Sequence, residues 1–338
     1  MGAHSIYSLF SLFQMGPAVY NSIEATAFCV AMIGNVTLFF LIIFKTDQEM
    51  EVYKIVLIYN CYSDVVLTVS SFFCKPFFVI YEGEMFMMAQ KLFNTPSSLY
   101  DFILYDTFVF VFYQLFMVVP LSCYYRYEAV CRAHIIPPLN FFILAVLADL
   151  IPFLNFLTNW WSVYPDEEKL AVYKTMVANS TSKLFDGSKI AALSINSHVE
   201  AGLSITFGMT TILLSYITTA TFLHKVIATF RVRNERSKWH DVNKQIAKVM
   251  VIQMCVPLAI STPALTLMWA MYVFQFEDDK YHYIVNILMT LTPLVNPFTG
   301  IFCIEAYRGY LSRLLCGKRT TAVATYSQSS AGSLHSSP

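Results

Sequence analysis

Residues Tyr283 to Arg319 read YIVNILMTLTPLVNPFTGIFCIEAYRGYLSRLLCGKR, and this stretch decides the fold of the chain. It begins with an uncharged apolar run of about twenty residues, which is long enough to cross a hydrocarbon core ~30 Å thick. Asparagines and prolines interrupt the run, and their polar groups are costly in lipid unless neighbouring helices satisfy them. We therefore expect a membrane-spanning helix inside a bundle, followed from Glu305 by an amphipathic helix along the membrane face.

The composition is that of a polytopic membrane protein. Of 338 residues, 57% are hydrophobic and only 13% are charged, which is about half the charged fraction of soluble domains. The formal net charge is zero, so nothing indicates attraction to nucleic acid, and we expect no such partner. The cysteines and histidines lack the spacing of a metal site, and we expect no cofactor.

Seven apolar runs predict an all-α membrane protein, a bundle of seven transmembrane helices over residues 18–304. The runs lie at about 18–44, 55–81, 100–124, 139–161, 197–223, 249–276 and 282–304. The remaining segments are interpreted as an extracellular amino terminus (1–17), an amphipathic eighth helix (305–317) and a disordered cytoplasmic tail (318–338). Cys316 ends the amphipathic segment and is a candidate for palmitoylation.

Lys and Arg residues predict the orientation of the spans. Most of them fall in the loops that follow the odd-numbered runs, most densely between 225 and 248. Cytoplasmic loops carry an excess of these residues, so the amino terminus is expected outside and the carboxyl tail inside. The sequon Asn179-Ser180-Thr181 then falls in an outer loop, which makes Asn179 a candidate for glycosylation.

Polar side chains within the apolar runs predict an internal switch. They are Asn35 in the first span, Asn60 and Asp64 on one face of the second, and Asn296 before Pro297 in the seventh. Amides and carboxylates inside a membrane span are functional candidates because they are expensive to bury. The alternative is plain hydrogen bonding between helices, worth about 0.6 kcal/mol per contact.

Two further groups of residues are candidates for the two ends of the bundle. At the inner end, basic and aromatic residues are candidates for contacting a cytoplasmic partner: Arg126, Tyr127, Arg132, Lys244 and Lys248. Their alternatives are headgroup anchoring and the general excess of positive charge inside. At the outer end, Asp106, His198 and Glu200 are candidates for a ligand pocket, although for each of them taken alone an interface residue is favoured over a ligand contact.

Together these marks resemble those of G-protein-coupled receptors. Gly34-Asn35, Asp64, Arg126 and Asn296-Pro297 match the superfamily's pattern, although Tyr125 stands where an acidic residue is usual. A closer resemblance is to the nematode serpentine chemoreceptors. It rests on Tyr125-Arg126-Tyr127 followed by Val130-Cys131-Arg132, on PLVNPFTGIFCIEAYR (293–308), where Ala306 replaces the usual proline, and on Leu314–Lys318. The last motif favours class r over class d.

That resemblance implies a receptor rather than an enzyme. Its partners would be a small environmental molecule, a heterotrimeric G protein and the surrounding lipid, at the plasma membrane or cilium of a sensory neuron. The first alternative is a seven-span ligand-gated channel of the insect odorant receptor type, whose amino terminus lies inside. An aspartyl intramembrane protease would need paired aspartates, but neither Asp64 nor Asp149 stands in a Gly-x-Gly-Asp motif. A transporter would show internal repeats, and none is found.

Overall fold

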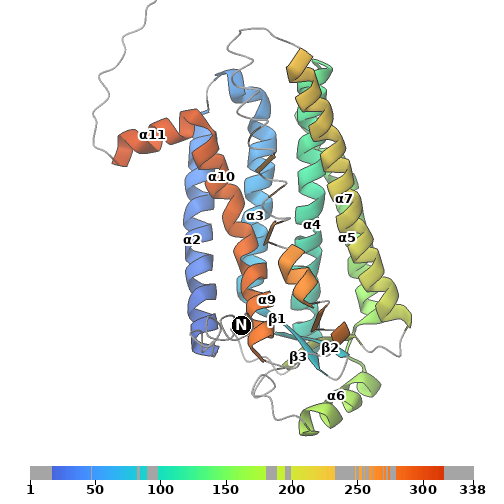
Figure 1. The fold of residues 1–338 in the computed structure, drawn as a ribbon. Coiled ribbons are helices and arrows are strands. Elements are labelled where there is room, and N and C mark those ends of the chain that lie inside the picture. The colour runs from blue at the N-terminus through green and yellow to red at the C-terminus, as the bar shows by residue number, and fades with distance from the viewer. Residues whose placement is uncertain are drawn as a thin grey trace, which may run out of the picture.

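The computed structural model is a bundle of long helices that carries a small sheet at one end (Figure 1). It describes residues 17–46, 48–81, 84–89, 98–179, 189–194, 199–232 and 279–315, with parts of the stretch from 248 to 274. The helices are α2 (Pro17–Phe44), η1 (Gln48–Tyr53), α3 (Lys54–Cys74), α4 (Ser98–Cys131), α5 (Pro138–Ser162), α6 (Glu167–Asn179), α7 (Val199–Val232), α9 (Asp279–Leu291), η3 (Thr292–Leu294), α10 (Val295–Cys303) and α11 (Glu305–Leu315). The strands are β1 (Pro76–Tyr81), β2 (Glu84–Ala89) and β3 (Lys189–Ser194).

The described residues contain six helices that are long and apolar enough to cross a membrane. They span Ala18–Phe44, Met50–Cys74, Leu99–Cys131, Pro138–Ser162, Thr206–Thr229 and Lys280–Cys303. The predicted all-α membrane fold is therefore confirmed, and six of the predicted runs coincide with these helices. The other run, 249–276, is described only in part.

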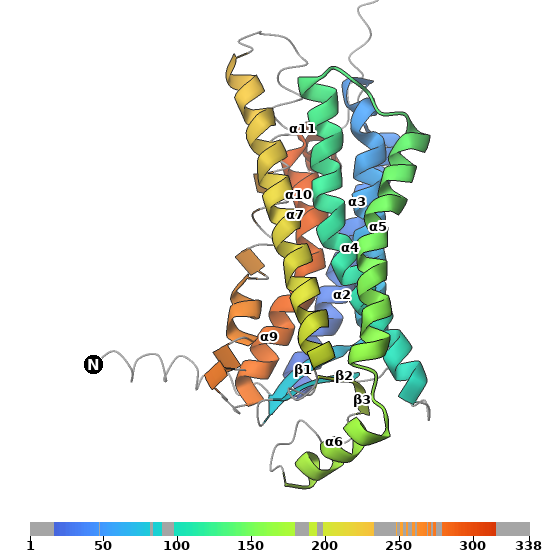
Figure 2. The same ribbon diagram turned by 90° about the vertical axis from the view of Figure 1, so that its right-hand side faces the viewer.

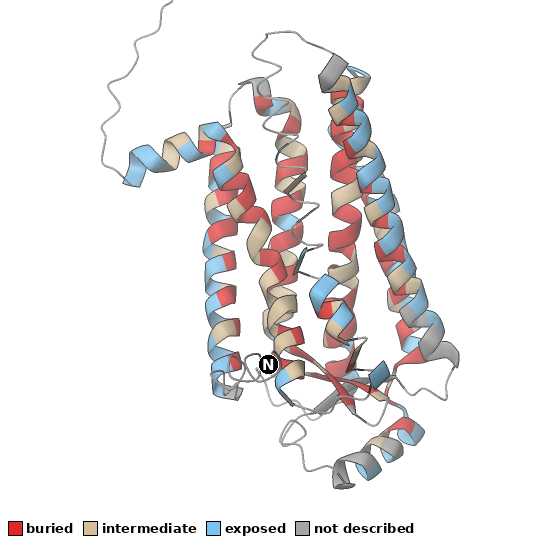
Figure 3. Cartoon of the chain, in the orientation of Figure 1, coloured by how far each residue is buried: buried red, intermediate tan, exposed pale blue. Residues whose placement is uncertain are grey.

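The spans differ in how much of their surface the bundle covers. In the most apolar stretch of each helix, 56% of α4 is buried inside the bundle, compared with 22% of α5. The helix α4 is therefore central and α5 is peripheral. Figure 3 shows exposed residues along the outward sides of α2 and α7, and many of them are large and apolar, such as Ile33 and Leu213. Exposed apolar side chains on spanning helices face lipid tails, with which they are compatible.

The second span ends earlier than the sequence analysis expected. The apolar run to residue 81 was interpreted as one helix, but α3 stops at Cys74 and β1 begins at Pro76. Proline cannot continue the helical ladder and disfavours helical geometry in the residue before it. Lys75 accordingly takes a left-handed conformation (φ 43°) and donates its backbone N–H to the Ser71 carbonyl oxygen (2.8 Å).

A three-stranded antiparallel sheet, which the sequence analysis missed, closes one end of the bundle. The strand order is β1-β2-β3, and Pro76 pairs with Ala89 at one end of the first ladder and Tyr81 with Glu84 at the other. Figures 1 and 2 place α6 beyond this sheet and α11 at the opposite end of the bundle. We call these two ends the sheet end and the α11 end.

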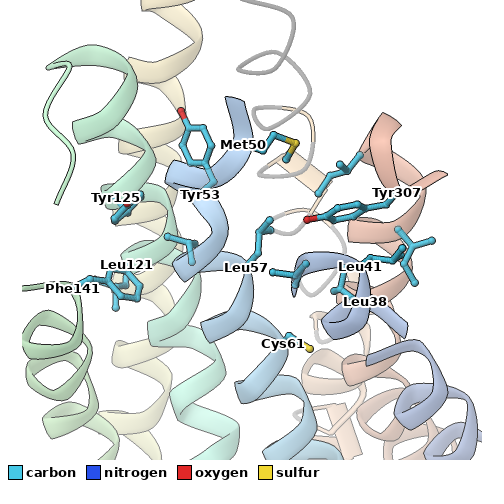
Figure 4. Close-up of a cluster of buried hydrophobic side chains, with 14 of the residues drawn as sticks. Leu38, Leu41, Met50, Tyr53, Leu57, Cys61, Leu121, Tyr125, Phe141 and Tyr307 are labelled. Atoms are coloured by element: carbon cyan, nitrogen blue, oxygen red, sulfur yellow. The ribbon is translucent and has the colours of Figure 1, made fainter. Parts of the chain in front are cut away.

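A buried cluster at the α11 end ties the amphipathic helix to the spans (Figure 4). Tyr307 of α11 is fully buried, and its hydroxyl lies 2.8 Å from the Thr46 hydroxyl after α2. Tyr125 of α4 donates its hydroxyl to the Val52 carbonyl oxygen (2.7 Å) and packs edge-on against Phe141 of α5. The start of α11 is thus held to the bundle, while its last residue, Leu315, is exposed.

Candidate functional site

A cavity of about 640 Å³ lies inside the bundle at the sheet end. Cavities of roughly 300–1,000 Å³ with apolar walls are typical of small-molecule sites. Its walls come from the sheet, α4, α7, α9 and the partly described stretch before α9. The lining residues are Phe78, Ile80, Met85, Met87, Tyr105, Phe108, Val109, Phe112, Tyr113, Thr206, Met209, Thr210, Ile212, Leu213, Leu265, Met268 and Met289.

The walls of this cavity are made largely of thioethers and aromatic rings. Methionines enter from β2, α7 and α9, and aromatic side chains enter mainly from α4. No charged side chain is among the described lining residues, and the polar atoms come from threonine and tyrosine hydroxyls. Methionine adapts to irregular shapes and makes favourable contacts with aromatic groups. The cavity therefore suits an uncharged, mainly apolar molecule.

Gly208 lets α7 approach the cavity wall closely. A Cβ atom at this position would overlap the hydroxyl of Tyr113, which lies against α7. Small residues allow membrane helices to approach each other in this way. Any larger residue here would force the Tyr113 ring to move, and that ring is part of the cavity wall.

Two side chains of α9 hold the outer edge of the sheet. The Asn286 amide accepts a hydrogen bond from the Phe78 N–H (3.0 Å) and donates one to the Phe78 carbonyl oxygen (3.2 Å). One turn earlier, His282 Nε2 lies 2.9 Å from the Ile80 nitrogen and 3.1 Å from its carbonyl oxygen. β1 is an edge strand, whose backbone groups need partners, and these side chains supply them. We call Asn286 and His282 the β1 clip.

Removing the β1 clip should loosen the cavity wall. We expect Asn286→Leu to lower the free energy of unfolding by about 1–3 kcal/mol, because the Phe78 N–H and carbonyl lose their buried partners. Thermal unfolding of the purified protein in detergent checks this. Thr158→Ala is the matched control, since the Thr158 hydroxyl donates within α5, to the Asn155 carbonyl oxygen (2.8 Å), and is no part of the β1 clip. Equal melting temperatures for both variants would show that the clip contributes nothing.

A polar contact joins the second and seventh spans near the middle of the bundle. Asn296 Nδ2 donates to Asp64 Oδ1 at 2.9 Å, and both side chains are buried. Asn35 of α2 donates its amide within its own helix, to the Ala31 carbonyl oxygen (3.0 Å), and its backbone carbonyl oxygen accepts the thiol of Cys61 of α3 (3.3 Å). The contact between Asp64 and Asn296 therefore joins two of the three spans, and the role of these residues in a switch stays a prediction.

Close packing of backbone surfaces makes this polar region compact. A Cβ at Gly34 would lie 3.3 Å from the Pro297 ring, and one at Gly300 would lie 3.0 Å from Leu38. Each of the two spans therefore contributes one glycine to their contact, Gly34 from the first and Gly300 from the seventh. Asn60 has a partner on another helix, because its amide oxygen accepts a hydrogen bond from the Ser122 hydroxyl of α4 (2.7 Å).

The end of α4 near α11 holds the candidate coupling residues. Arg126 is 1% exposed, whereas Arg132 is exposed and pairs with Glu128 at 3.1 Å. The Tyr127 ring lies between two cations, Lys225 of α7 and Arg132, each 5.5 Å from its centre. Cation–π contacts of this kind link the ends of α4 and α7. Lys248 is exposed, and Lys244 lies outside the described residues.

Comparison with known proteins places the chain in a family. The family model described as serpentine type 7TM GPCR chemoreceptor Srd matches residues 20–313, which include the cavity, the β1 clip and the Asp64–Asn296 contact. The chain belongs to the Srd family of serpentine chemoreceptors. This Srd chain is thus a multi-pass membrane protein and a chemosensory receptor of the G-protein-coupled type.

Curated relatives of this Srd chain come from Caenorhabditis elegans. Serpentine receptor class delta-33 is 21% identical over 311 residues, which cover 88% of this chain and 87% of that protein. Serpentine receptor class delta-32 is 25% identical over 83 residues, which cover 25% of this chain and 24% of that protein. The relationship to serpentine chemoreceptors of class r or class d is confirmed, but the preference for class r was wrong, since the match is to class d.

Of the three residues predicted to line the ligand pocket of this Srd receptor, only the side chain of Asp106 is described, and it does not line the cavity. Asp106 is buried on the side of α4 that faces α5, where its carboxylate accepts a hydrogen bond from Asn159 Nδ2 (2.8 Å). It is not a lining residue. Glu200 belongs to the first turn of α7, but its side chain is outside the described part, as is His198.

Sequence reasoning missed the residues that do build the site. The cavity wall consists mostly of ordinary apolar residues, which carry no signal in a chain that is 57% hydrophobic. The β1 clip did carry a signal, because His282 and Asn286 stand four residues apart in an apolar run. Polar residues so placed share one helix face and need partners in the bundle. Cys316 lies outside the described residues, and the side chain of Asn179 is not described.

Proposed function

We propose that this Srd receptor binds a small, uncharged, mainly apolar environmental molecule in the cavity at the sheet end and activates a heterotrimeric G protein at the α11 end. The observation that carries the proposal is the cavity itself, about 640 Å³ in volume and lined by methionines and aromatic rings. A charged ligand would find no described counter-charge in this wall, and burying an unpaired charge is expensive.

The proposed orientation puts the sheet end outside the cell. The basic stretch between 225 and 248 then lies in the cytoplasm together with α11, in agreement with the positive-inside rule. In this orientation Asn179 would lie outside the cell, where it can be glycosylated, and Cys316 would lie on the cytoplasmic side, where it can be palmitoylated. The membrane in question is the plasma membrane, at the cilium of a sensory neuron.

The β1 clip offers a physical route from the cavity to the polar contact. Phe78 and Ile80 of β1 line the cavity, and their backbones are bonded to Asn286 and His282 of α9. The chain runs on through η3 to Asn296, which bonds to Asp64. A ligand that binds one arrangement of these elements more tightly shifts the population toward it. The Asp64–Asn296 contact, with Asn35 and Pro297 beside it, is the proposed switch.

The coupling step requires the inner ends of the helices to separate. Arg126 is buried in this arrangement, so a cytoplasmic partner cannot reach its guanidinium until the helix ends around it separate. The contact between Lys225 of α7 and the Tyr127 ring of α4 joins two of these helices and would break if they moved apart. Arg126 and Tyr127 are the proposed central contacts, with Arg132, Lys244 and Lys248 around them.

Filling the cavity tests where the ligand binds. We expect Val109→Trp to weaken the potency of an activating ligand by about tenfold or more, because the new ring would occupy the space that the ligand needs, a loss of at least ~1.4 kcal/mol. Ile103→Trp is the matched control, since Ile103 lies on the same helix but is 40% exposed and outside the lining.

The measurement is the concentration–response curve of tagged receptor in cells that carry a promiscuous G protein. Potencies are compared at equal surface expression, and the ligand is first found by screening pools of volatile compounds. If Val109→Trp and Ile103→Trp leave the potency equal to that of the unmodified receptor, the ligand binds elsewhere.

A further inference from the structure

A second cavity opens on the outside of the helix bundle near the α11 end, away from the proposed ligand site. It has a volume of about 520 Å³ and lies between α2, α10 and α11. Its walls are almost entirely apolar, and Ile33 and Phe302, which flank it, are 67% and 60% exposed. We call this cavity the α11 groove, and the argument uses Ile33, Thr37, Phe302, Arg308, Leu311 and Leu315 of its lining.

The groove follows from the way the three helices meet. Gly34 brings α2 against Pro297 at the start of α10, so these two helices touch below the groove. The chain then turns at Ile304, and α11 leaves the direction of α10 and runs out across the end of the bundle (Figure 1). A wedge-shaped space remains where α11 passes over α2, and its walls face the hydrocarbon of the bilayer.

One charged side chain lines this groove. Arg308 is exposed, and its Nη1 donates to the Phe302 carbonyl oxygen (3.2 Å). That bond holds the guanidinium beside the apolar wall while other donors of the guanidinium stay available, since an arginine carries five. Lys45 contacts another residue of α11, with its Nζ 4.5 Å from the centre of the Tyr310 ring, which does not line the groove. The groove therefore combines apolar walls with one cation, Arg308.

We propose that the α11 groove binds an anionic phospholipid, with one acyl chain along Ile33, Thr37 and Phe302 and the headgroup phosphate at Arg308. A guanidinium suits phosphate because its parallel N–H groups match two phosphate oxygens. A net negative headgroup is favoured because the Arg308 guanidinium carries a positive charge at the end of the groove where the headgroup would lie. This binding site is independent of the ligand cavity and of G-protein activation.

Native mass spectrometry of the full-length receptor in detergent tests the proposal, because bound lipid appears as a defined added mass. After incubation with phosphatidylserine or phosphatidylcholine, we expect one phosphatidylserine per receptor and less phosphatidylcholine. Arg308→Gln should lower phosphatidylserine occupancy by about fivefold, the factor expected for one basic residue at an anionic surface. Arg313→Gln is the matched control, since Arg313 bonds to the Gly309 carbonyl oxygen and is outside the groove.

A second variant separates the apolar part of the site from its charge. Thr37→Phe should reduce the occupancy of both lipids by filling the groove, with an unchanged melting temperature as the sign of intact folding. Equal retention of the two lipids by the unmodified receptor, or equal loss in the Arg308 and Arg313 variants, would overturn the proposal. So would a spectrum that shows a covalent acyl mass without phospholipid, or a receptor dimer without phospholipid.

Discussion

Replacing Asp64 by leucine should reduce the ratio of ligand-stimulated to basal signalling by about tenfold or more. The Asp64 carboxylate accepts the Asn296 amide at 2.9 Å in a buried setting, and a hydrogen bond to such a group contributes about 1.5–3 kcal/mol. If the bond belongs to one of two arrangements, its loss changes their ratio by about tenfold to a hundredfold. The ratio is measured in cells, at surface expression matched by a tag.

Two companion variants separate a switch from simple packing. Asp64→Asn combined with Asn296→Asp restores a carboxylate–amide pair in reverse, so this double variant should recover most of the ligand response. Asn60→Ala removes a contact of similar depth on the same helix, the bond to Ser122 (2.7 Å). A bond of that kind is worth about 0.6 kcal/mol, or roughly threefold. An Asp64 variant that responds as strongly as the Asn60 variant would rule out the switch.

Replacing Arg126 by alanine should abolish ligand-driven signalling while ligand binding in the cavity remains. Arg126 is the buried cation at the inner end of α4, and in the proposed active arrangement its guanidinium meets the G protein. A neutral methyl group can make no charge-assisted hydrogen bond there. G-protein activation is measured in membranes, and ligand binding is measured in the same preparation.

Two control variants accompany this prediction. One keeps a positive charge at position 126, and the other removes a positive charge elsewhere at the same end of the bundle. Arg126→Lys retains a cation and should keep part of the response, because lysine lacks the planar fork of donors. Lys54→Ala removes a half-buried cation at the same end of the bundle, where Lys54 pairs with Glu51 at 3.2 Å, and it should signal normally. Signalling by Arg126→Ala at the unmodified level would remove Arg126 from the coupling surface.

Hydropathy and motif spacing predicted the spans and the polar contact but not the sheet. A span of about twenty apolar residues is a local property, so runs such as 18–44 and 139–161 match helices closely. The sheet depends on strands from two distant segments, and β3 begins a hundred residues after β2 ends. The run PFFVIY (76–81) would be apolar as a helix and as a strand, so periodicity does not distinguish the two, and only Pro76 marked the end of the helix.

The difference between local properties and contacts of distant segments also explains which site residues were found from the sequence. Asp64 and Asn296 stood out because polar groups in apolar runs need partners, and the structure brings the two together. Asp106 stood out for the same reason, yet its partner is Asn159 of α5. Depth along a helix can be read from sequence, but the face that meets the cavity is decided by tertiary packing. The methionine and aromatic walls arise only when α4, α7 and the sheet come together.

The most direct test of the account is whether an amino-terminal tag is accessible on intact cells that respond to a ligand. The account requires the sheet end, and with it the entrance to the cavity, to face outward. Antibody labelling of the tag without permeabilisation, together with a G-protein response, is the predicted result. Labelling only after permeabilisation would place the cavity on the cytoplasmic side, contradict the receptor mechanism, and favour a channel with an inner amino terminus.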